Sequence, residues 1–505
     1  MAYSVLEAPV IPVLMKDGAR TVVGIRDAFL LAHDIRDIQE ITPLERYAIL
    51  RMLIAFAMDM LHPKDSYARR DLWDQKKFDA VAFDRYVDLC EEDGPRFDLF
   101  DSNHPFLQSR YDETLDAKPT AKKSVATLFH ALPSGNNHIF FDHRLENTQA
   151  VSFAEAFRAL CACYLFCISN TSGPGSINNT PPLYAVIVGN NLFETLIINM
   201  LSEKEALPVS YGTGTVPWRN GKKVIPREEV PDVTLLQALT WMPRRITLIP
   251  EDHQTVREVY FQSGLNFRGN NRWKDPHVPY SRKKENILFS TIKPEFGRSI
   301  WRDVGSLLYD HDDGKVRPPQ VVRCLENILE NDEKPEWIPI RTSGLIVSGG
   351  RTAKYEDWCE EELRLPAVLL YDYILANQFR ADIEAVENVQ KILYSNVKKY
   401  VDNPRSESTD NKQDEIAQQC RQHFLNKAHD LLFGECLDEI CKGIPEQEHA
   451  DHFCDAVKKL LQDTLSDIMK KTGNSTKSLK KQMNAEKWIW KKFGTAVKKR
   501  KEGYA

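Results

Sequence analysis

The C-terminal part of the chain is nearly free of the two residues that most often interrupt a helix. Between residues 355 and 500, these residues occur only as Gly434, Gly443, Gly473, Gly494, Pro366, Pro404 and Pro445. Long helical patterns run over residues 355–402, 411–441, 446–471 and 476–499. Because long helices with short connections pack side by side in alternating directions, the pattern predicts an antiparallel four-helix bundle in residues 355–505.

The N-terminal part has a different character, with short Val- and Ile-rich runs among many Gly, Pro and Trp residues. A hairpin is expected around Gly18, and helices are expected to begin at Thr42 and Ser152. With 505 residues the chain exceeds a usual single domain. We therefore predict an α+β fold. A large mixed N-terminal domain with short sheets and helices, residues 1–354, is followed by the C-terminal bundle, residues 355–505.

Composition places the chain among globular proteins, with 42% apolar and 28% charged residues. No apolar run reaches the ~20 residues needed to cross a bilayer, and the first residues lack the basic start of a secretion signal. The ten cysteines form no CxxC pair. Cys161, Cys163 and Cys167 share an apolar segment and are expected to pack as small hydrophobes. A cytoplasmic location is therefore expected.

A loop of small residues, 170–182, separates the apolar segments 151–168 and 183–200. Such a loop leaves backbone N–H groups bare of side chains, so that they can approach another molecule closely. Gly, Pro and Asn are also the ordinary turn residues, so a plain connection is the alternative interpretation. Loops often carry function, and this one is the most unusual segment in the first half of the chain.

Charge is distributed unevenly along the chain. The net charge of −5 argues against a nucleic-acid binder. Twelve Lys or Arg residues and one acid, Glu486, nevertheless lie between Lys470 and Lys501, with Trp488 and Trp490 among them. A basic helix with aromatic residues is typical of contact with a phosphate backbone. A solvated helix face that is anchored by its tryptophans is the alternative.

Familiar catalytic motifs are absent from the sequence, which contains no Walker loop, G-x-G-x-x-G, G-x-S-x-G or H-E-x-x-H. A metal site of a nuclease would have to take its ligands from His130, His138, Asp142 and His143. Their spacing matches no standard ligand set. No metal site, no cofactor and no active site are predicted.

Several short pieces occur in an order that resembles a known family. They are Leu132-Pro-Ser-Gly-Asn-Asn137, Phe140-Phe-Asp-His143, Asn190-Asn-Leu-Phe-Glu-Thr195, Trp241-Met-Pro-Arg-Arg-Ile-Thr-Leu248, Trp273-Lys-Asp-Pro-His277, Ile300-Trp-Arg-Asp303, and Ala353-Lys354 ahead of Trp358 and Leu365-Pro366. Together with the helical C-terminal part, they resemble the large subunit of the type I-E CRISPR surveillance complex Cascade, the CasA family. Some relatives carry metal-binding cysteines after the Trp241 motif, but residues 250–262 contain none.

The resemblance implies a non-enzymatic subunit of an RNA-guided antiviral complex. Guide RNA reads the target sequence, while this subunit inspects the short protospacer-adjacent motif (PAM) in the duplex. In the family a glycine-rich loop does so from the minor groove, which favours reading by backbone donors and shape. The corresponding residues here are Gly173, Gly175, Ser176, Asn178 and Asn179. Arg268 is the candidate for the basic residue that assists the loop.

The resemblance also implies a wedge that separates the first base pairs. Its tip corresponds to Gly349, Gly350, Arg351 and Thr352, where relatives commonly carry glutamine in place of Thr352. Arg351 can substitute by stacking on a base or by contacting phosphate. A simple Gly-Gly turn is the alternative interpretation.

Further contacts follow from the same resemblance. The segment 124–143 corresponds to the loop that docks into Cascade and touches the guide RNA, with Phe129, Asn136 and Asn137 as candidate contacts. The candidate contacts with the DNA backbone are Lys480, Lys481, Lys491 and Lys492. Expected partners are other Cascade subunits, guide RNA, target duplex and a helicase-nuclease, with no membrane. The competing hypotheses are a metal-dependent nuclease that uses His138, Asp142 and His143, or a pure assembly scaffold.

Overall fold

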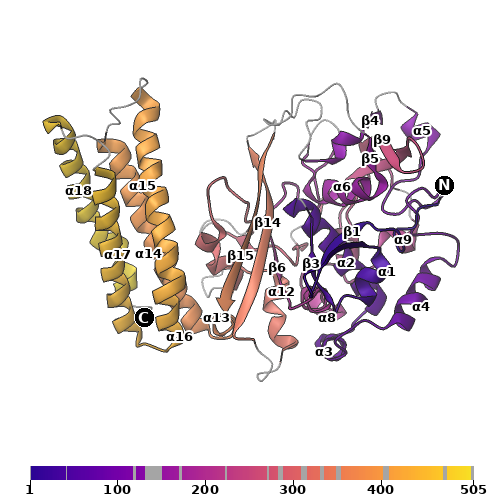
Figure 1. The fold of residues 1–505 in the computed structure, drawn as a ribbon, viewed down its shortest axis with the longest axis horizontal. Coiled ribbons are helices and arrows are strands. Elements are labelled where there is room, and N and C mark those ends of the chain that lie inside the picture. The colour runs from indigo at the N-terminus through magenta and orange to yellow at the C-terminus, as the bar shows by residue number, and fades with distance from the viewer. Residues whose placement is uncertain are drawn as a thin grey trace. The chain divides into compact units, whose positions relative to one another are not determined.

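The computed structural model describes residues 2–40, 42–117, 121–130, 150–169, 173–221, 224–269, 272–282, 288–308, 316–329, 335–348, 354–401, 409–469 and 475–501. The chain divides into two compact units (Figure 1). The first comprises Met1–Arg298 and Asp310–Leu365, and the second comprises Ser299–Tyr309 and Pro366–Ala505. The fold is a mixed α+β fold with short sheets and a helical C-terminal region, in agreement with the predicted class.

The first unit contains many short elements. Its described helices are α1 (Ile25–Leu30), α2 (Pro43–Leu61), α3 (Ser66–Asp74), α4 (Ala80–Cys90), α5 (Glu113–Asp116), α6 (Phe153–Phe166), α7 (Leu192–Asn199), α8 (Glu203–Ala206), α9 (Pro217–Asn220), α10 (Leu235–Leu239) and α12 (Gln320–Arg323). Its described strands are β1 (Ile11–Met15), β2 (Arg20–Val23), β3 (Ile35–Ile38), β4 (Lys122–Ser124), β5 (Val151–Ser152), β6 (Tyr184–Ile187), β7 (Glu229–Val230), β8 (Arg244–Pro250), β9 (Thr255–Ser263), β10 (Asn266–Phe267), β11 (Tyr280–Ser281), β12 (Ser290–Thr291), β13 (Val316–Arg317), β14 (Trp337–Ser348) and β15 (Lys354–Pro366).

These strands form several small sheets. The strand orders are β2-β1-β3, β10-β7, β12-β11-β13, β15-β14-β6 and β4-β9-β5, with β8 also paired to β9. β1 and β2 are antiparallel, with Ile11 opposite Val23, which confirms the hairpin expected around Gly18. β14 and β6 are antiparallel, with Ile340 opposite Ile187.

Helix α2 forms the centre of the first unit. Thr42 caps it by accepting a hydrogen bond from the Glu45 amide over 3.2 Å, and Pro43 occupies the first turn, as the sequence predicts. Fourteen of its 19 residues are buried and none is exposed, so α2 has no solvent face. It packs against α6, α7 and α10. Because its whole circumference is buried, any charged side chain on α2 needs an internal partner.

Helix α6 begins as predicted. Ser152 accepts a hydrogen bond from the Glu155 amide, and the Glu155 carboxylate accepts one from the Ser152 amide over 2.8 Å. Cys161, Cys163 and Cys167 are buried and free of disulfide bonds, which confirms that they pack as small hydrophobes. Burial raises the pKa of the Cys161 thiol to about 12.

The predicted helix over residues 355–402 is wrong in its first part. Lys354–Pro366 is strand β15, which neighbours β14 in the sheet. Its acidic side chains are held by arginines from other elements, since Arg46 pairs with Glu360 at 2.7 Å and Arg341 with Glu362 at 3.0 Å. Strand pairing and these ion pairs override the helix propensity of a Glu-rich segment.

The second unit begins at Pro366 and also takes in residues 299–309, whereas the sequence placed a boundary at 354/355. Arg302 lies in the segment 299–309 and pairs with Glu387. The distance from Arg302 Nη2 to Glu387 Oε2 is 2.9 Å. The helices of this unit are α11 (Gly305–Leu308), α13 (Val368–Tyr371), α14 (Tyr373–Tyr400), α15 (Thr409–Leu431), α16 (Leu437–Cys441), α17 (Glu446–Met469), α18 (Thr476–Ala496) and α19 (Lys498–Lys501). α14 packs against α15 and α18, and α15 packs against α17 (Figure 1).

A buried charge cluster joins several helices of the second unit. Arg500 of α19 pairs with Asp382 of α14, and the Asp382 carboxylate lies 2.8 Å from Nε2 of His449 on α17. His449 Nδ1 lies 2.7 Å from Glu439 on α16. Arg500 is therefore a structural cation, although it belongs to the basic C-terminal stretch.

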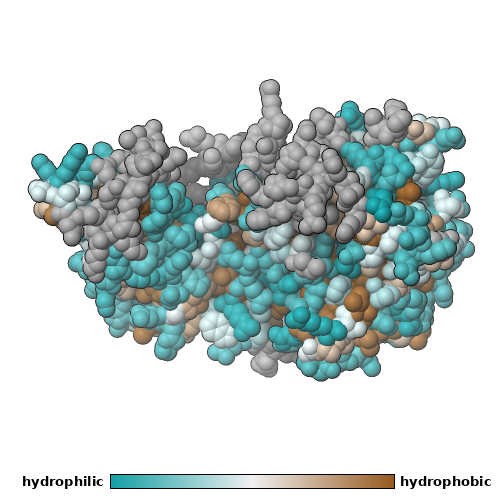
Figure 2. Space-filling model, turned by 45° about the horizontal axis from the view of Figure 1, so that its top comes forward, coloured by the Kyte–Doolittle hydropathy of each residue, from teal (hydrophilic) through white to brown (hydrophobic). Residues whose placement is uncertain are grey.

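Hydrophobic residues on the face shown in Figure 2 occur in small groups among hydrophilic ones. None of the described helices has the length and apolar character that a membrane span needs.

Candidate functional site

The small-residue loop between α6 and β6 closes on itself. Its described part, residues 173–182, contains an antiparallel bridge between Ser176 and Asn179. The Ser176 amide donates to the Cys167 carbonyl over 2.8 Å, and the Asn179 amide donates to the Ser176 carbonyl over the same distance. Asn179 takes a left-handed backbone conformation, with φ +69°, which asparagine tolerates better than most residues. The loop is therefore a tight turn.

Two glycines of this loop are required by its own packing. A Cβ atom at Gly175 would lie 2.2 Å from the Asn179 carbonyl oxygen. Gly173 has φ +145°, and a Cβ atom there would lie 2.8 Å from Arg244 Nη1. Gly173, Gly175 and Ser176 are buried, whereas Asn179 is exposed. Among the predicted loop contacts, Asn179 is therefore the side chain that a second molecule reaches without rearrangement.

Arg244, at the start of β8, holds the loop from inside. It is 1% exposed, and it donates hydrogen bonds to the carbonyl oxygens of Pro174 and, over 3.1 Å, of Ile168. The same guanidinium thus contacts both the end of the preceding apolar segment and the loop itself. A buried arginine that donates to carbonyl oxygens fixes the backbone path of the loop.

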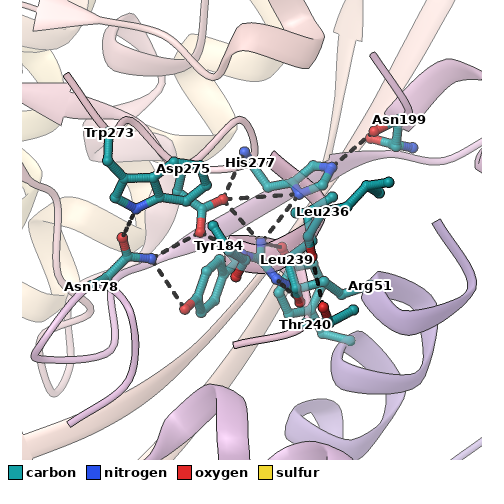
Figure 3. Close-up of polar contacts among 12 residues, drawn as sticks. Arg51, Asn178, Tyr184, Asn199, Leu236, Leu239, Thr240, Trp273, Asp275 and His277 are labelled. Carbon is teal, nitrogen blue, oxygen red and sulfur yellow. Dashed lines mark hydrogen bonds and ion pairs between the residues drawn. The ribbon is translucent and has the colours of Figure 1, made fainter. Parts of the chain in front are cut away.

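Asn178 ties the loop to the core of the first unit (Figure 3). Its Nδ2 donates to Asp275 Oδ2 over 2.9 Å and to the Tyr184 hydroxyl over 3.4 Å. Its Oδ1 accepts a hydrogen bond from Trp273 Nε1 over 3.3 Å. Because both ends of the amide are engaged, the geometry indicates that Asn178 anchors the loop.

The carboxylate that receives Asn178 belongs to a buried ion pair (Figure 3). Asp275 is 1% exposed and Arg51, from α2, is 2% exposed. Arg51 Nη2 lies 2.8 Å from Oδ2 and Nη1 lies 3.0 Å from Oδ1, a two-pronged contact. Burial alone would raise the pKa of Asp275, but the charge and hydrogen bonds of Arg51 outweigh it and lower that pKa below its usual value. The pair stays ionised and presents a fixed charge to Asn178.

His277 extends this network to α7. Its Nε2 lies 2.9 Å from the carbonyl oxygen of Asn199 at the end of α7. Burial, followed by the nearby positive charge of Arg51, lowers the pKa of His277 to about 4. The imidazole is therefore neutral at neutral pH. The network thus joins α2, α7 and the loop through groups whose charges are fixed near pH 7.

Sequence reasoning missed the roles of Arg51, Arg244 and Asp275. Arg51 carries a recognisable signal, because it is the one basic residue in the apolar run 47–58 of a helix with no solvent face. Arg244 and Asp275 fall inside motifs that identified the resemblance, but no spacing rule relates Asp275 to a loop 97 residues earlier.

Two further predicted site residues are described. Arg268 follows β10, is 65% exposed at its side chain and lies 3.4 Å from Glu229. Phe129 is half-buried at the end of the 3₁₀ segment Val125–Leu128. Burial lowers the pKa of the adjacent His130 to about 4, and its ring contacts Phe166 and Tyr355.

The remaining candidates of the first unit lie outside the described residues. They are Asn136, Asn137, His138, Asp142, His143, Gly349, Gly350, Arg351 and Thr352. The strands on either side of the predicted wedge tip are described, and β14 and β15 are neighbours in one sheet. The wedge therefore stays a prediction, with a strand pair as its flanks.

The basic helix α18 presents most of its lysines to solvent. Lys480, Lys491 and Lys492 are exposed and Lys481 is half-buried. Lys491 Nζ lies 4.8 Å from the centre of the Trp488 ring, a cation–π contact. Within the described part of the chain, no His, Cys, Asp or Glu cluster is arranged to hold a metal ion.

Comparisons with known proteins agree with the resemblance. The family model of the CRISPR-associated protein Cse1 matches residues 5–495. CasA/Cse1 from Thermus thermophilus is 30% identical over 381 residues, which cover 73% of this chain and 72% of that protein. The crystal structure of Cse1 from Acidimicrobium ferrooxidans has a TM-score of 0.78 at 20% identity and covers 99% of both chains. A chain of a CRISPR RNA-guided surveillance complex has a TM-score of 0.75 at 19% identity, covering 97% of this chain and 99% of that one. The chain therefore belongs to the family of the CRISPR-associated protein Cse1, also named CasA, the large subunit of the type I-E system.

Proposed function

We propose that this chain is the non-catalytic large subunit of an RNA-guided surveillance complex, that it recognises the PAM in double-stranded DNA, and that it helps to open the duplex. The same proposal includes two further roles. The chain docks into the surveillance complex through Phe129, Asn136 and Asn137, and it recruits a helicase-nuclease. The support is membership of the Cse1 family and a fold shared with a chain of an RNA-guided surveillance complex.

The observation that carries PAM recognition is the anchored loop with an exposed tip. Arg244 and Asn178 hold the loop from inside, which leaves the side-chain amide of Asn179 at the surface. The minor groove offers acceptors on every base pair and a donor only on G·C pairs, so an amide presented at a fixed position distinguishes them. Because the loop is already ordered by the core, little conformational entropy is lost when it enters a groove.

Asn179→Gly tests this role with little disturbance of the backbone. Glycine adopts the left-handed conformation of residue 179 freely, so the substitution removes the side-chain amide and retains the turn. In a reconstituted complex we expect the affinity ratio between PAM-bearing and PAM-less duplex to fall by roughly fivefold or more, the usual scale for one base contact. Asn426→Ala, at an exposed position of α15, is the matched control.

The outcomes of this test separate the hypotheses. An unchanged ratio with normal assembly would contradict PAM reading by this tip. If the chain assembles but no variant of the loop alters DNA binding, the subunit is a scaffold. Bulky substitutions at Gly173 or Gly175 are poor tests, because their Cβ atoms collide with the loop itself or with Arg244.

The wedge is proposed at residues 349–352, between the neighbouring strands β14 and β15. Replacing Arg351 and Thr352 together with alanine should slow the opening of the first base pairs without changing PAM preference. Fluorescence of 2-aminopurine placed beside the PAM measures that opening. A normal rate in the double variant would favour the plain-turn interpretation.

For the second unit we propose an antiparallel four-helix bundle of α14, α15, α17 and α18, whose exposed α18 lysines contact the DNA backbone. Lys480→Ala with Lys492→Ala should weaken binding to all sequences and reduce the slope of log affinity against log salt by about 1.8. Lys458→Ala with Lys459→Ala changes two exposed α17 lysines and the same charge, so it is the control. If the two double substitutions reduced DNA affinity equally, that result would contradict a specific role for α18.

A further inference from the structure

A cavity in the first unit lies outside the loop and its network. It has a volume of about 500 Å³ and is lined by Arg96, by the segment 103–113 and by residues around α9 that include Gly221. Pockets of a few hundred Å³ are the usual size for small-molecule sites. Nothing in the proposed DNA or guide contacts involves this cavity.

Arg96 is the unusual member of the lining. It is 8% exposed, yet neither Nε nor Nη1 of its guanidinium has a hydrogen-bond partner among the described residues. The buried Ser109 hydroxyl lines the same cavity and is likewise without a partner there. Buried cations and hydroxyls are normally paired, because leaving them unpaired costs free energy. Two such groups on one cavity are donors available to a molecule that accepts hydrogen bonds.

The imidazole of His104 lies near the same point. The position that a Cβ atom of Gly221 would take is 2.9 Å from Arg96 Nη1 and 3.5 Å from His104 Nε2. The missing side chain at Gly221 thus leaves room beside both groups. Burial and then the charge of Arg96 lower the pKa of His104, so a negative charge in the cavity would restore it.

Asp112 and Glu113 are the acidic residues of the lining. The Asp112 carboxylate caps α5, accepting a hydrogen bond from the Thr114 amide over 2.9 Å. Glu113 is exposed. Within the described residues, Nε and Nη1 of Arg96 donate to neither of these carboxylates, so they stay available to a ligand.

We propose that this cavity binds the phosphate group of a mononucleotide-sized ligand, with Arg96, Ser109 and His104 as its donors. A hydrogen bond from a guanidinium to a phosphate oxygen is charge-assisted and therefore strong, and a phosphate has several oxygens that can accept from more than one donor. The apolar part of the lining, which includes Pro105, Tyr111 and Met242, surrounds the rest of the ligand. The site is separate from PAM recognition and does not rest on it.

Calorimetric titration of the full chain with AMP, adenosine and inorganic phosphate tests the proposal. We expect AMP to bind and adenosine, which lacks the phosphate, to bind at least tenfold more weakly. Arg96→Met should abolish AMP binding and leave the thermal unfolding temperature without ligand equal or higher, because two of the buried guanidinium nitrogens have no hydrogen-bond partner among the described residues. Ser109→Ala should weaken AMP binding threefold or more and serves if Arg96→Met does not fold.

Two competition measurements identify the molecule that supplies the phosphate group. Competition by a short 5′-phosphorylated RNA, but not by its 5′-hydroxyl form, assigns the site to a strand end. AMP binding without such competition assigns it to a free nucleotide. Equal affinity for AMP and adenosine, or AMP binding that is unchanged in both variants, would overturn the proposal.

Discussion

Removal of the Asn178 amide should loosen the loop at residues 173–182 while the rest of the first unit stays folded. Asn178→Ala deletes a 2.9 Å hydrogen bond to the ionised Asp275, a 3.3 Å bond from Trp273 and a long contact to Tyr184. A hydrogen bond to a charged group contributes about 1.5–3 kcal/mol, and a neutral one about 1 kcal/mol. Asp275 keeps both bonds from Arg51, so the expected loss is about 2–3 kcal/mol, confined to the loop.

Amide hydrogen exchange measures this loss directly. The Ser176 amide donates to the Cys167 carbonyl across the base of the loop, and it exchanges only when the loop opens. At 1.4 kcal/mol per tenfold, the exchange rate of Ser176 should rise by roughly 30- to 150-fold in Asn178→Ala. Asn179→Gly, whose lost side chain faces solvent, should change that rate by less than about threefold.

A Ser176 exchange rate in Asn178→Ala within threefold of the unmodified chain would refute the anchoring role of Asn178. A rise that extends equally to amides of α2 would also count against it, because the effect would then be general destabilisation and not local opening.

Three further predictions follow from the buried groups. Arg51→Met should destabilise the first unit by about 3–5 kcal/mol, because it leaves Asp275 as an unpaired buried charge, and Arg51→Met with Asp275→Leu should recover much of the loss in urea unfolding. Lowering the pH from 6.5 to 4 should reduce the free energy of unfolding by up to about 1.4 kcal/mol per pH unit for His277. The unfolded chain takes up this proton near pH 6.5, whereas the folded pKa is about 4, and His277→Gln should lose this part of the pH dependence. Gly175→Ala should cost about 1–3 kcal/mol in thermal unfolding through overpacking, whereas Gly494→Ala, in an open helix position, should stabilise α18.

Local signals in the sequence identified the elements that are specified locally. Thr42 with Pro43, and Ser152 with Glu155, place the starts of α2 and α6 correctly, because a cap depends on residues within one turn. The strand β15 was missed for the opposite reason. Its Glu-rich sequence favours a helix, and it is held extended by β14 and by arginines more than ten residues away.

The loop between α6 and β6 was likewise predicted only in part. Its composition marked residues 170–182 as unusual, and the resemblance gave residues 173–179 a role, but the reason for the glycines differs from the one expected. They permit close approach of the loop's own backbone and of Arg244. The anchor formed by Asn178, Asp275 and Arg51 joins residues far apart in the chain. Pairing at such separations follows from the fold and from no local pattern.

The most direct test of PAM recognition by the loop tip compares duplex and single-stranded target in a reconstituted complex that carries Asn179→Gly. Binding of single-stranded DNA complementary to the guide needs no PAM, so it reports assembly and base pairing alone. We predict unchanged affinity for the single strand and a loss of preference for PAM-bearing duplex. Equal preference in the variant and the unmodified complex would contradict this role of the loop.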